Sequence, residues 1–435
     1  MNHPTGLSRR AFAKSILAGS AAALTGLEAL NAGIYQKVAA LNQKYLDDEA
    51  PDGPYWEEIR GLFQFEDRFI MMNNGTLGPM PKSVFNTLTR YFRVQVANPF
   101  DSYNYLPTFR EAVRTKLAAF VNASPDEVAM TSNTTEGLNF VINGLDFKEG
   151  DEVLTSNFEH PGHLGPWKLK EKRTGVRLKV VDLPITPRSV DEIVGAFAAA
   201  ITPKTRMISL GHTVFITGLI SPLKELSKLA HEKGLLIMAD SAHGIGMLDL
   251  DMKALGIDVF ASSPYKWLGA PTGIGLLYVR KEALDKVWPT VVSSGWENVQ
   301  RAAKLDPSGQ RSDAMLFALD EALNFNNRIG KTRIERRIKA LAARLKQELA
   351  RIPGVKVHTS ADPYLSAGLT AFSMAGVEAE RLVDYLREKY NLVVRTMGSR
   401  EAGTYGVRVS TPIYVSTKEV DMVVDGVRTL LSHKA

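Results

Sequence analysis

The segment 261-ASSPYKWLGAPTGIG-275 contains the end of an apolar run, a lysine and a series of glycines. The run Val259–Ser262 is typical of a buried strand, and Lys266 follows it by a few residues. The glycines beyond it allow sharp backbone turns. A lysine just past a core strand, surrounded by aromatic and small residues, can be desolvated, which lowers its pKa and suits Schiff-base chemistry. A surface lysine lying over Trp267 is the alternative.

On both sides of this segment, short apolar runs alternate with helical patterns from about residue 65 to 290. The expected strands are Glu127–Thr131, Glu152–Ser156, Leu178–Asp182, Arg206–Leu210, Leu235–Ala239 and Val259–Ser262. The expected helices include Pro107–Phe120, Val190–Ala200 and Leu223–Lys233. Such alternation predicts an α/β fold, with a mostly parallel, doubly wound sheet in a large domain over residues 65–310.

After residue 311 the pattern changes. One face of a long helix is marked by Ile334, Ile338, Leu341, Leu345 and Leu349. Short strands are expected around Lys356–Thr359, Leu369–Met374 and Gly406–Ser410, with a helix near Glu378–Tyr390. We therefore expect a smaller C-terminal α+β domain over residues 311–435.

The composition is that of an ordinary globular protein, with 45% hydrophobic and 23% charged residues among 435. A net charge of +6 is too weak to indicate a nucleic-acid partner. The chain has no cysteine, which excludes disulfides, thiolate metal sites and a cysteine nucleophile. No His–carboxylate spacing suggests a metal site, and no phosphate-loop or dinucleotide motif is present.

The N-terminus carries the pair Arg9-Arg10 ahead of a short Ala- and Gly-rich run. This pattern predicts a twin-arginine export signal over residues 1–32, passage through the twin-arginine translocase and a periplasmic location. Gly26 and Glu28 break the apolar run, so a stable membrane span is not expected. A cytosolic tail and a membrane anchor are the alternatives. Residues 33–64 are expected to form a polar, partly helical linker.

Asp240 follows the expected strand Leu235–Ala239. Carboxylates at the carboxyl ends of parallel strands face the ligand crevice, although an Asp there often only caps a turn. Pyridoxal phosphate needs both a lysine for its aldehyde and a carboxylate for its pyridine nitrogen. Asp240 and Lys266 together therefore predict this cofactor.

Three further motifs fit that cofactor. The residues 131–138 place hydroxyl side chains at a helix start, which favours a phosphate, although Asn133 and Glu136 have the spacing of simple capping. His160 follows another strand and could stack on a ring. Arg408 lies in a C-terminal strand and could bind a carboxylate, or be a surface arginine.

The ordered motifs resemble the class V aminotransferase family of fold-type I pyridoxal-phosphate enzymes, and within it the isopenicillin N epimerase-like branch. The motifs are TSNTTEG (131–137), NFEHPG (157–162), DSAHG (240–244), SPYKWLGAPTGIG (263–275) and GVRVSTPIYVSTKEVD (406–421). The resemblance covers roughly residues 65–435.

The resemblance implies a role for each site residue. Lys266 would hold the cofactor, Asp240 would bind its ring nitrogen with His243 beside it, His160 would stack on the ring, and Thr134, Thr135, Ser263 and Tyr265 would bind near the phosphate. Tyr265 is also a candidate second acid/base. Arg408 and Asn74, in the loop 73–78, would contact the substrate.

The family also implies a homodimer, in which the regions around Trp296 or Gly309-Gln310 are candidates to reach the partner's phosphate. The chain departs from the family at Phe215, where relatives often have a polar residue near the ring hydroxyl, and at Gly309-Gln310, where Gly-Thr is frequent.

The predicted function is a pyridoxal-phosphate enzyme acting at the α-carbon of an amino acid or aminoacyl metabolite, as an aminotransferase or epimerase. Three alternatives stay open: periplasmic tailoring of the glutamate side chain of a pyoverdine-type siderophore, a C–S or other β-lyase, and a non-catalytic binding protein of the same fold. The lack of cysteine excludes sulfur transfer to an enzyme cysteine, as in the usual cysteine desulfurases.

Overall fold

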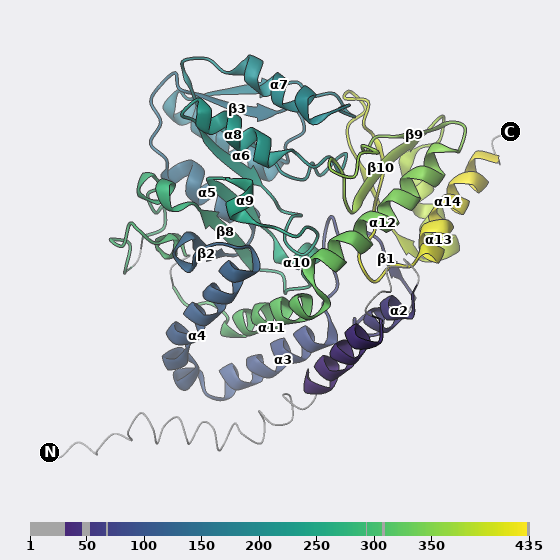
Figure 1. Ribbon diagram of the computed structural model, residues 1–435, viewed down its shortest axis with the longest axis horizontal. Helices are drawn as coiled ribbons and strands as arrows, with labels where there is room; N and C mark the ends of the chain where they lie inside the picture. The colour runs from purple at the N-terminus through teal and green to yellow at the C-terminus, as the bar shows by residue number, and fades with distance from the viewer. Residues whose placement is uncertain (1–30, 46–52, 67, 293, 307–308, 433–435) are drawn as a thin grey trace.

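A seven-stranded sheet forms the centre of the larger part of the chain (Figure 1). The computed structural model describes residues 31–45, 53–66, 68–292, 294–306 and 309–432, so most of the predicted export signal lies outside the described residues. In spatial order the strands are β2 (Val128–Thr131), β8 (Gly275–Val279), β7 (Val259–Ser262), β6 (Leu236–Asp240), β5 (Thr205–Gly211), β3 (Glu152–Ser156) and β4 (Arg177–Val181).

All pairings in this sheet are parallel except the two made by β8. The predicted mostly parallel α/β sheet is therefore confirmed, and each of the six predicted strands lies within one residue of an observed one. Strand β8 was not predicted. It is fully buried and returns the chain antiparallel after the glycine-rich turn.

Neighbouring residues along each strand pack on opposite faces of the sheet. On β6, Ile237 belongs to one apolar core and Met238 to another. One face is covered by α4 (Pro99–Phe120), α7 (Val190–Ala200) and α8 (Leu223–Glu232). The other is covered by α5 (Thr134–Gly144) and α6 (Pro161–Thr174). Both faces are thus buried, as expected of a doubly wound sheet.

The C-terminal part contains a four-stranded antiparallel sheet. Its order is β12 (Arg395–Met397), β13 (Gly406–Ser410), β10 (Leu369–Met374) and β9 (Val355–Val357). It packs with α12 (Lys331–Ala350), α13 (Ala379–Tyr390) and α14 (Thr417–Ser432). These elements confirm the expected C-terminal α+β pattern, whereas the predicted domain boundaries stay predictions.

The N-terminal segment contributes to the core of this C-terminal part. Residues 31–44 are helical, and α2 (Pro54–Arg60) follows. Val38, Tyr55 and Ile59 are buried in the apolar cluster that also contains α12 and α14. This region therefore contains helices whose apolar side chains pack into the core of the C-terminal part.

The remaining elements connect these parts. They are β1 (Ile70–Met71), which pairs with β11 (Leu392–Val393), α3 (Lys82–Ala97), α9 (Met252–Leu255), α10 (Pro264–Trp267), α11 (Asp313–Ile329), and the 3-10 helices η1 (Pro125–Glu127), η2 (Lys281–Lys286) and η3 (Ala302–Leu305). Helices α3, α4 and α11 lie together at one end of the molecule (Figure 1).

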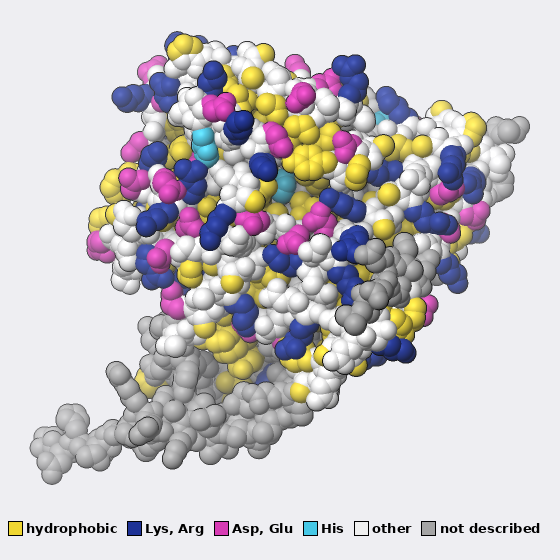
Figure 2. Space-filling model, in the orientation of Figure 1, with side chains coloured by type: hydrophobic (Ala, Val, Ile, Leu, Met, Phe, Trp, Pro, Cys, Tyr) yellow, Lys and Arg dark blue, Asp and Glu magenta, His cyan; other side chains and the backbone are white. Residues whose placement is uncertain are grey.

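The surface carries charges of both signs. Figure 2 shows basic and acidic side chains interspersed over one face, without a continuous patch of one sign. Within the described ranges, no helix combines the length and hydrophobicity needed to cross a membrane.

Candidate active site

The carboxyl ends of five strands meet at one edge of the large sheet and surround a cavity. The residues that end these strands are Thr131, Ser156, Gly211, Asp240 and Ser262. The loops that follow bring together all eight predicted cofactor-binding residues in the cavity lining: Thr134, Thr135, His160, Asp240, His243, Ser263, Tyr265 and Lys266. A ligand crevice at this edge is what the topology of an open α/β sheet predicts.

Lys266 lies in the short helix α10, which begins at Pro264 directly after β7. Its carbonyl accepts a hydrogen bond from Nδ2 of Asn74 at 2.9 Å, which fixes the turn from outside. Burial lowers the pKa of Lys266 to about 8, against an opposing effect of Asp240. Its Nζ forms no hydrogen bond with the described residues. The amine is therefore buried, readily deprotonated and available for chemistry.

Asp240 ends β6 with its carboxylate on the cavity wall. Oδ1 accepts a hydrogen bond from the backbone N–H of Ala242 at 3.1 Å, which orients the side chain. The carboxylate forms no ion pair with a described residue. An anchored, nearly buried carboxylate of this kind suits a positively charged ring nitrogen.

Hydroxyl groups gather at the start of α5. Thr134 Oγ1 lies 2.7 Å from Ser263 Oγ, and the backbone N–H of Thr134 donates to the same Ser263 oxygen at 3.2 Å. Asn133 caps the helix by accepting from the N–H of Glu136 at 2.9 Å. Capping by Asn133 and a hydroxyl cluster from Thr134 and Ser263 thus coexist, and the helix start presents donors suited to a phosphate.

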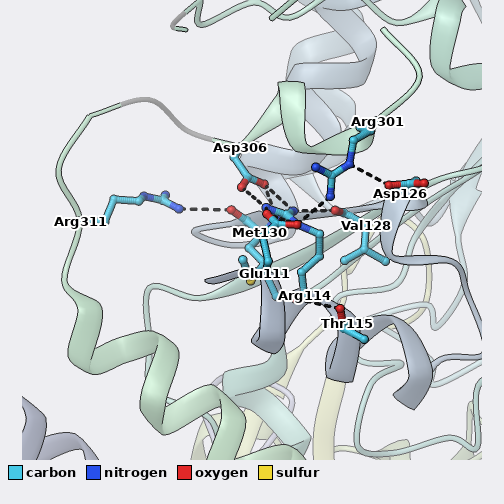
Figure 3. Close-up of polar contacts among 9 residues, drawn as sticks. All are labelled: Glu111, Arg114, Thr115, Asp126, Val128, Met130, Arg301, Asp306 and Arg311. Carbon is cyan, nitrogen blue, oxygen red and sulfur yellow. Dashed lines mark hydrogen bonds and ion pairs between the residues drawn. The ribbon is translucent and has the colours of Figure 1, made fainter. Parts of the chain in front are cut away.

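A polar cluster anchors the strand that leads into these hydroxyls (Figure 3). The buried Arg114 donates from Nη1 to the carbonyl of Val128 at 2.7 Å and pairs with Asp306 at 2.7 Å. Asp306 in turn accepts from the backbone N–H of Met130 at 2.9 Å. Arg311 reaches the same strand and donates to Ser132 Oγ at 2.5 Å. Asp306 and Arg311 therefore hold the end of β2 and the hydroxyl-rich loop in place.

His160 caps α6, where its Nδ1 accepts a hydrogen bond from the N–H of Gly162 at 3.0 Å. Burial lowers the pKa of His160, so the ring is neutral near pH 7 and carries its proton on Nε2. The ring of Phe215 meets it edge-on, with centroids 4.8 Å apart and planes at 80°. Phe215 lines the cavity with an apolar ring.

A buried ion pair behind His160 was not anticipated from the sequence. Nδ1 of His163 lies 2.8 Å from Glu159 Oε2, and both side chains are at most 1% exposed. Nε2 of His163 lies 2.6 Å from Ser209 Oγ on β5. Glu159 Oε1 also accepts from Ser156 Oγ on β3 at 2.6 Å. The first turn of α6, with His160, is thereby attached to two strands.

His243 lines the cavity, and His212 lies between two residues that line it, Gly211 and Thr213. Nδ1 of His243 accepts from the indole N–H of Trp267 at 3.3 Å, and burial holds the pKa of His243 well below its usual value. His212 lies 2.9 Å from Ser241 Oγ, and burial lowers the pKa of His212 to about 4. Both imidazoles are therefore neutral in the folded protein.

Arg408 and Asn74 adjoin the cavity from the C-terminal part and the loop 73–78. Arg408 is 1% exposed, its Nη1 donates to the carbonyl of Phe215 at 2.8 Å, and its Nε has no partner. No described carboxylate forms an ion pair with this guanidinium. Asn74 differs, because its amide nitrogen binds Lys266 and its oxygen accepts from Tyr414. Within the protein Asn74 therefore positions the Lys266 turn.

Comparison with known proteins identifies the family. The aminotransferase class-V family matches residues 72–423. The chain belongs to the class V aminotransferase family. Class V aminotransferases use pyridoxal phosphate, so the predicted cofactor is confirmed, and the cavity fits it. A deprotonatable buried lysine, an anchored carboxylate and a hydroxyl-lined helix start are the three groups that its aldehyde, ring nitrogen and phosphate require.

Individual members of the family differ in activity. This class V chain is 30% identical to the isopenicillin N epimerase of Streptomyces clavuligerus, over 86% of the chain and 98% of that protein. It is 29% identical to a cysteine desulfurase of Klebsiella pneumoniae, with the same coverage. The solved structure of the cysteine desulfurase CsdA from Escherichia coli superposes with a TM-score of 0.75 and 26% identity, over 87% of this chain and 98% of that one.

Proposed function

We propose that this protein catalyses a reaction at the α-carbon of an amino acid, or of an aminoacyl group of a larger metabolite, with Lys266 as the proton-transferring base. The observation that carries the proposal is the single cavity that is lined by the buried Lys266, by Asp240 and His160, and by the Thr134–Ser263 hydroxyls. A non-catalytic protein of the same fold has no need of a lysine held buried and without a partner.

Each side chain has a definable task in this proposal. Pyridoxal phosphate, when bound, supplies an electron sink for the pair of electrons left by the α-proton. Asp240 would keep the ring nitrogen protonated, and Thr134 and Ser263 would hold the phosphate. With a pKa of about 8, Lys266 can accept and return a proton near neutral pH. Tyr265, which also lines the cavity, is the candidate second acid/base.

Arg408 would hold the substrate by its carboxylate. A buried guanidinium with a free Nε and no acidic partner is an unfavourable arrangement in the free protein. A substrate carboxylate would supply both the missing negative charge and an acceptor for this N–H. The planar fork also fixes the orientation of the α-carbon relative to the Lys266 amine.

The reaction type is tested by following the α-proton in heavy water. L- and D-amino acids, aminoacyl peptides and siderophore precursors with a free glutamate amine form the substrate panel. Exchange with inversion and no keto acid supports epimerisation, as in the named epimerase relative, and keto acid formation supports transamination. Release of ammonia together with the β-substituent, such as sulfide from cysteine, would instead show a β-lyase. A cofactor-loaded protein that exchanges no α-proton in any member of the panel would contradict the proposal.

We also propose that the protein is exported by the twin-arginine route and forms a homodimer. Support for export is the pair Arg9-Arg10. Support for the dimer is a set of exposed apolar side chains on α3, α4 and the segment after β8: Phe92, Val96, Phe100, Trp288 and Trp296. Cell fractionation of the wild type against Arg9→Lys/Arg10→Lys, and sedimentation of the purified protein, test the two statements. Cytoplasmic wild-type protein, or a monomer, would contradict them.

A further inference from the structure

Arg395 and Arg408 are direct neighbours on the small sheet. In the antiparallel pair β12–β13 they are opposite each other in register. Side chains at opposite positions of two antiparallel strands project from the same face. Two guanidinium groups therefore leave this face side by side, next to the loop 73–78.

One short hydrogen-bonded chain joins the two arginines. Nη2 of Arg408 donates to Asn73 Oδ1 at 3.4 Å, and the hydroxyl of Thr76 donates to the same oxygen at 3.1 Å. Nη1 of Arg395 donates to the Thr76 oxygen at 3.1 Å. These contacts are all to neutral groups. They hold both guanidinium groups toward the loop that also contacts Lys266 through Asn74.

Neither arginine has an acidic partner among the described residues. Some other exposed arginines do have one: Arg188 pairs with Glu192, Arg344 with Asp421, and Arg400 with Glu378. Two like charges at opposite positions destabilise a sheet. Burial is the larger cause, and the positive charge of Arg395 the smaller one, of a lowering of the pKa of Arg408 to about 9. The pair is thus an uncompensated positive site in the ligand-free protein.

We propose that Arg395 forms a second anion subsite beside Arg408, so that the substrate carries an acidic group in addition to its α-carboxylate. This rests on the proposed function, in which Arg408 binds the α-carboxylate. Arg408 is buried next to the cavity, whereas Arg395 is exposed on the solvent side. The distal acid therefore lies toward the mouth of the site, and the substrate class is an α-amino diacid or an aminoacyl compound with a second acidic group.

The experiment measures binding of dicarboxylates that have no amine and cannot react with the cofactor. Calorimetry on the cofactor-loaded protein compares succinate, glutarate and adipate with their matched mono-amides succinamate, glutaramate and adipamate. Each pair differs by one negative charge. We expect at least one diacid to bind about tenfold more tightly than its mono-amide, the value of one charge-assisted hydrogen bond. Arg395→Gln should remove this difference, and Arg395→Lys should keep part of it.

Two further variants separate the subsites from general charge effects. Arg408→Gln should weaken diacids and mono-amides alike, and Arg188→Gln, which removes the same charge from an exposed arginine outside this pair, should change neither. Equal binding of every diacid and its mono-amide in the wild type would overturn the proposal, as would an unchanged preference in Arg395→Gln. Failure of the proposed function has a different signature, since it appears as absent α-proton exchange whatever the diacid preference.

Discussion

The side-chain oxygens of Thr134 and Ser263 lie 2.7 Å apart although the two residues are separated by 129 positions in the chain. They meet because β2 and β7 end at the same edge of the large sheet, on either side of the antiparallel β8. Together with the backbone N–H of Thr134 they give the start of α5 a cluster of hydrogen-bonding groups at the place where a phosphate is favoured.

Replacing Thr134 by Val, or Ser263 by Ala, should weaken cofactor binding. Each change removes a hydroxyl donor to a charged phosphate, so we expect affinity to fall about tenfold to a hundredfold. This affinity is measured by titrating the cofactor-free protein with pyridoxal phosphate and monitoring the visible absorption. Thr155→Val is the matched control, because the Thr155 hydroxyl is buried without a partner and its loss should leave cofactor affinity unchanged. Equal effects at positions 134 and 155 would speak against a phosphate site.

The rate of cofactor capture should depend on pH through Lys266. Burial lowers the pKa of Lys266 to about 8, and the neutral amine is the reactive form. The rate constant should rise about tenfold per pH unit below about pH 8 and level off above it. Stopped-flow mixing of the cofactor-free protein with pyridoxal phosphate gives the profile. A rise that continues to about pH 10, as for an exposed lysine, is the opposite result.

Replacing Arg408 by Met should weaken substrate binding without destabilising the fold. The change removes a buried guanidinium without an acidic partner, so the free energy of unfolding should stay equal or increase by about 1 kcal/mol. Binding of amino acids should weaken at least about tenfold. Urea unfolding and ligand titration measure the two effects. A strongly destabilised variant would show that Arg408 serves the fold rather than the substrate.

The ion pair of Glu159 and His163 should make stability depend on pH. Burial opposes the charged imidazole, but the Glu159 carboxylate outweighs it and raises the pKa of His163 above its usual value. Because the pKa of His163 is higher in the folded than in the unfolded protein, protonation of this imidazole stabilises the folded state. The stabilisation is complete below the unfolded pKa of about 6.5 and is lost as the pH rises through the folded pKa. His163→Gln should therefore cost about 3 kcal/mol near pH 6 and less near pH 9.

Urea midpoints of the wild type and His163→Gln at the two pH values test this dependence. Glu192→Gln, which breaks the exposed pair with Arg188, should show no comparable difference. The absorption band of the bound cofactor gives a second readout, because His160 shares the first turn of α6 with His163. A difference in stability that does not vary with pH would mean that His163 is neutral and the pair is an ordinary hydrogen bond.

The strands of the large sheet could be predicted because each is a short apolar run that ends in a polar or small residue. The same regularity predicted the site, since Asp240 and Lys266 follow neighbouring strands. Strand β8 was missed because its apolar run Gly275–Val279 directly follows the glycine-rich turn. Burial of Tyr55 and Ile59 depends on helices α12 and α14, which are far away in sequence.

Other parts of the site depend on register and on side-chain contacts. Glu159 and His163 are four residues apart at the start of a helix, a spacing that could have indicated a pair. Their burial against Ser209 comes from the packing of α6 on β5. The position of Arg395 opposite Arg408 follows from the register of β12 and β13, which cannot be derived from the sequence of either strand alone. Asn74 lies beside Lys266 because the loop 73–78 crosses from another part of the chain.

The central claim is that Lys266 holds the cofactor, and it is tested most directly by peptide mapping after borohydride reduction. The cofactor-loaded protein should lose its visible absorption band on reduction, and mass spectrometry should find the cofactor attached to the peptide that contains Lys266. Lys266→Ala should have neither the band nor the adduct, whereas Lys346→Ala, which removes another buried lysine, should keep both. A wild-type adduct on a different lysine, or a protein that stays colourless with excess cofactor, would contradict the claim.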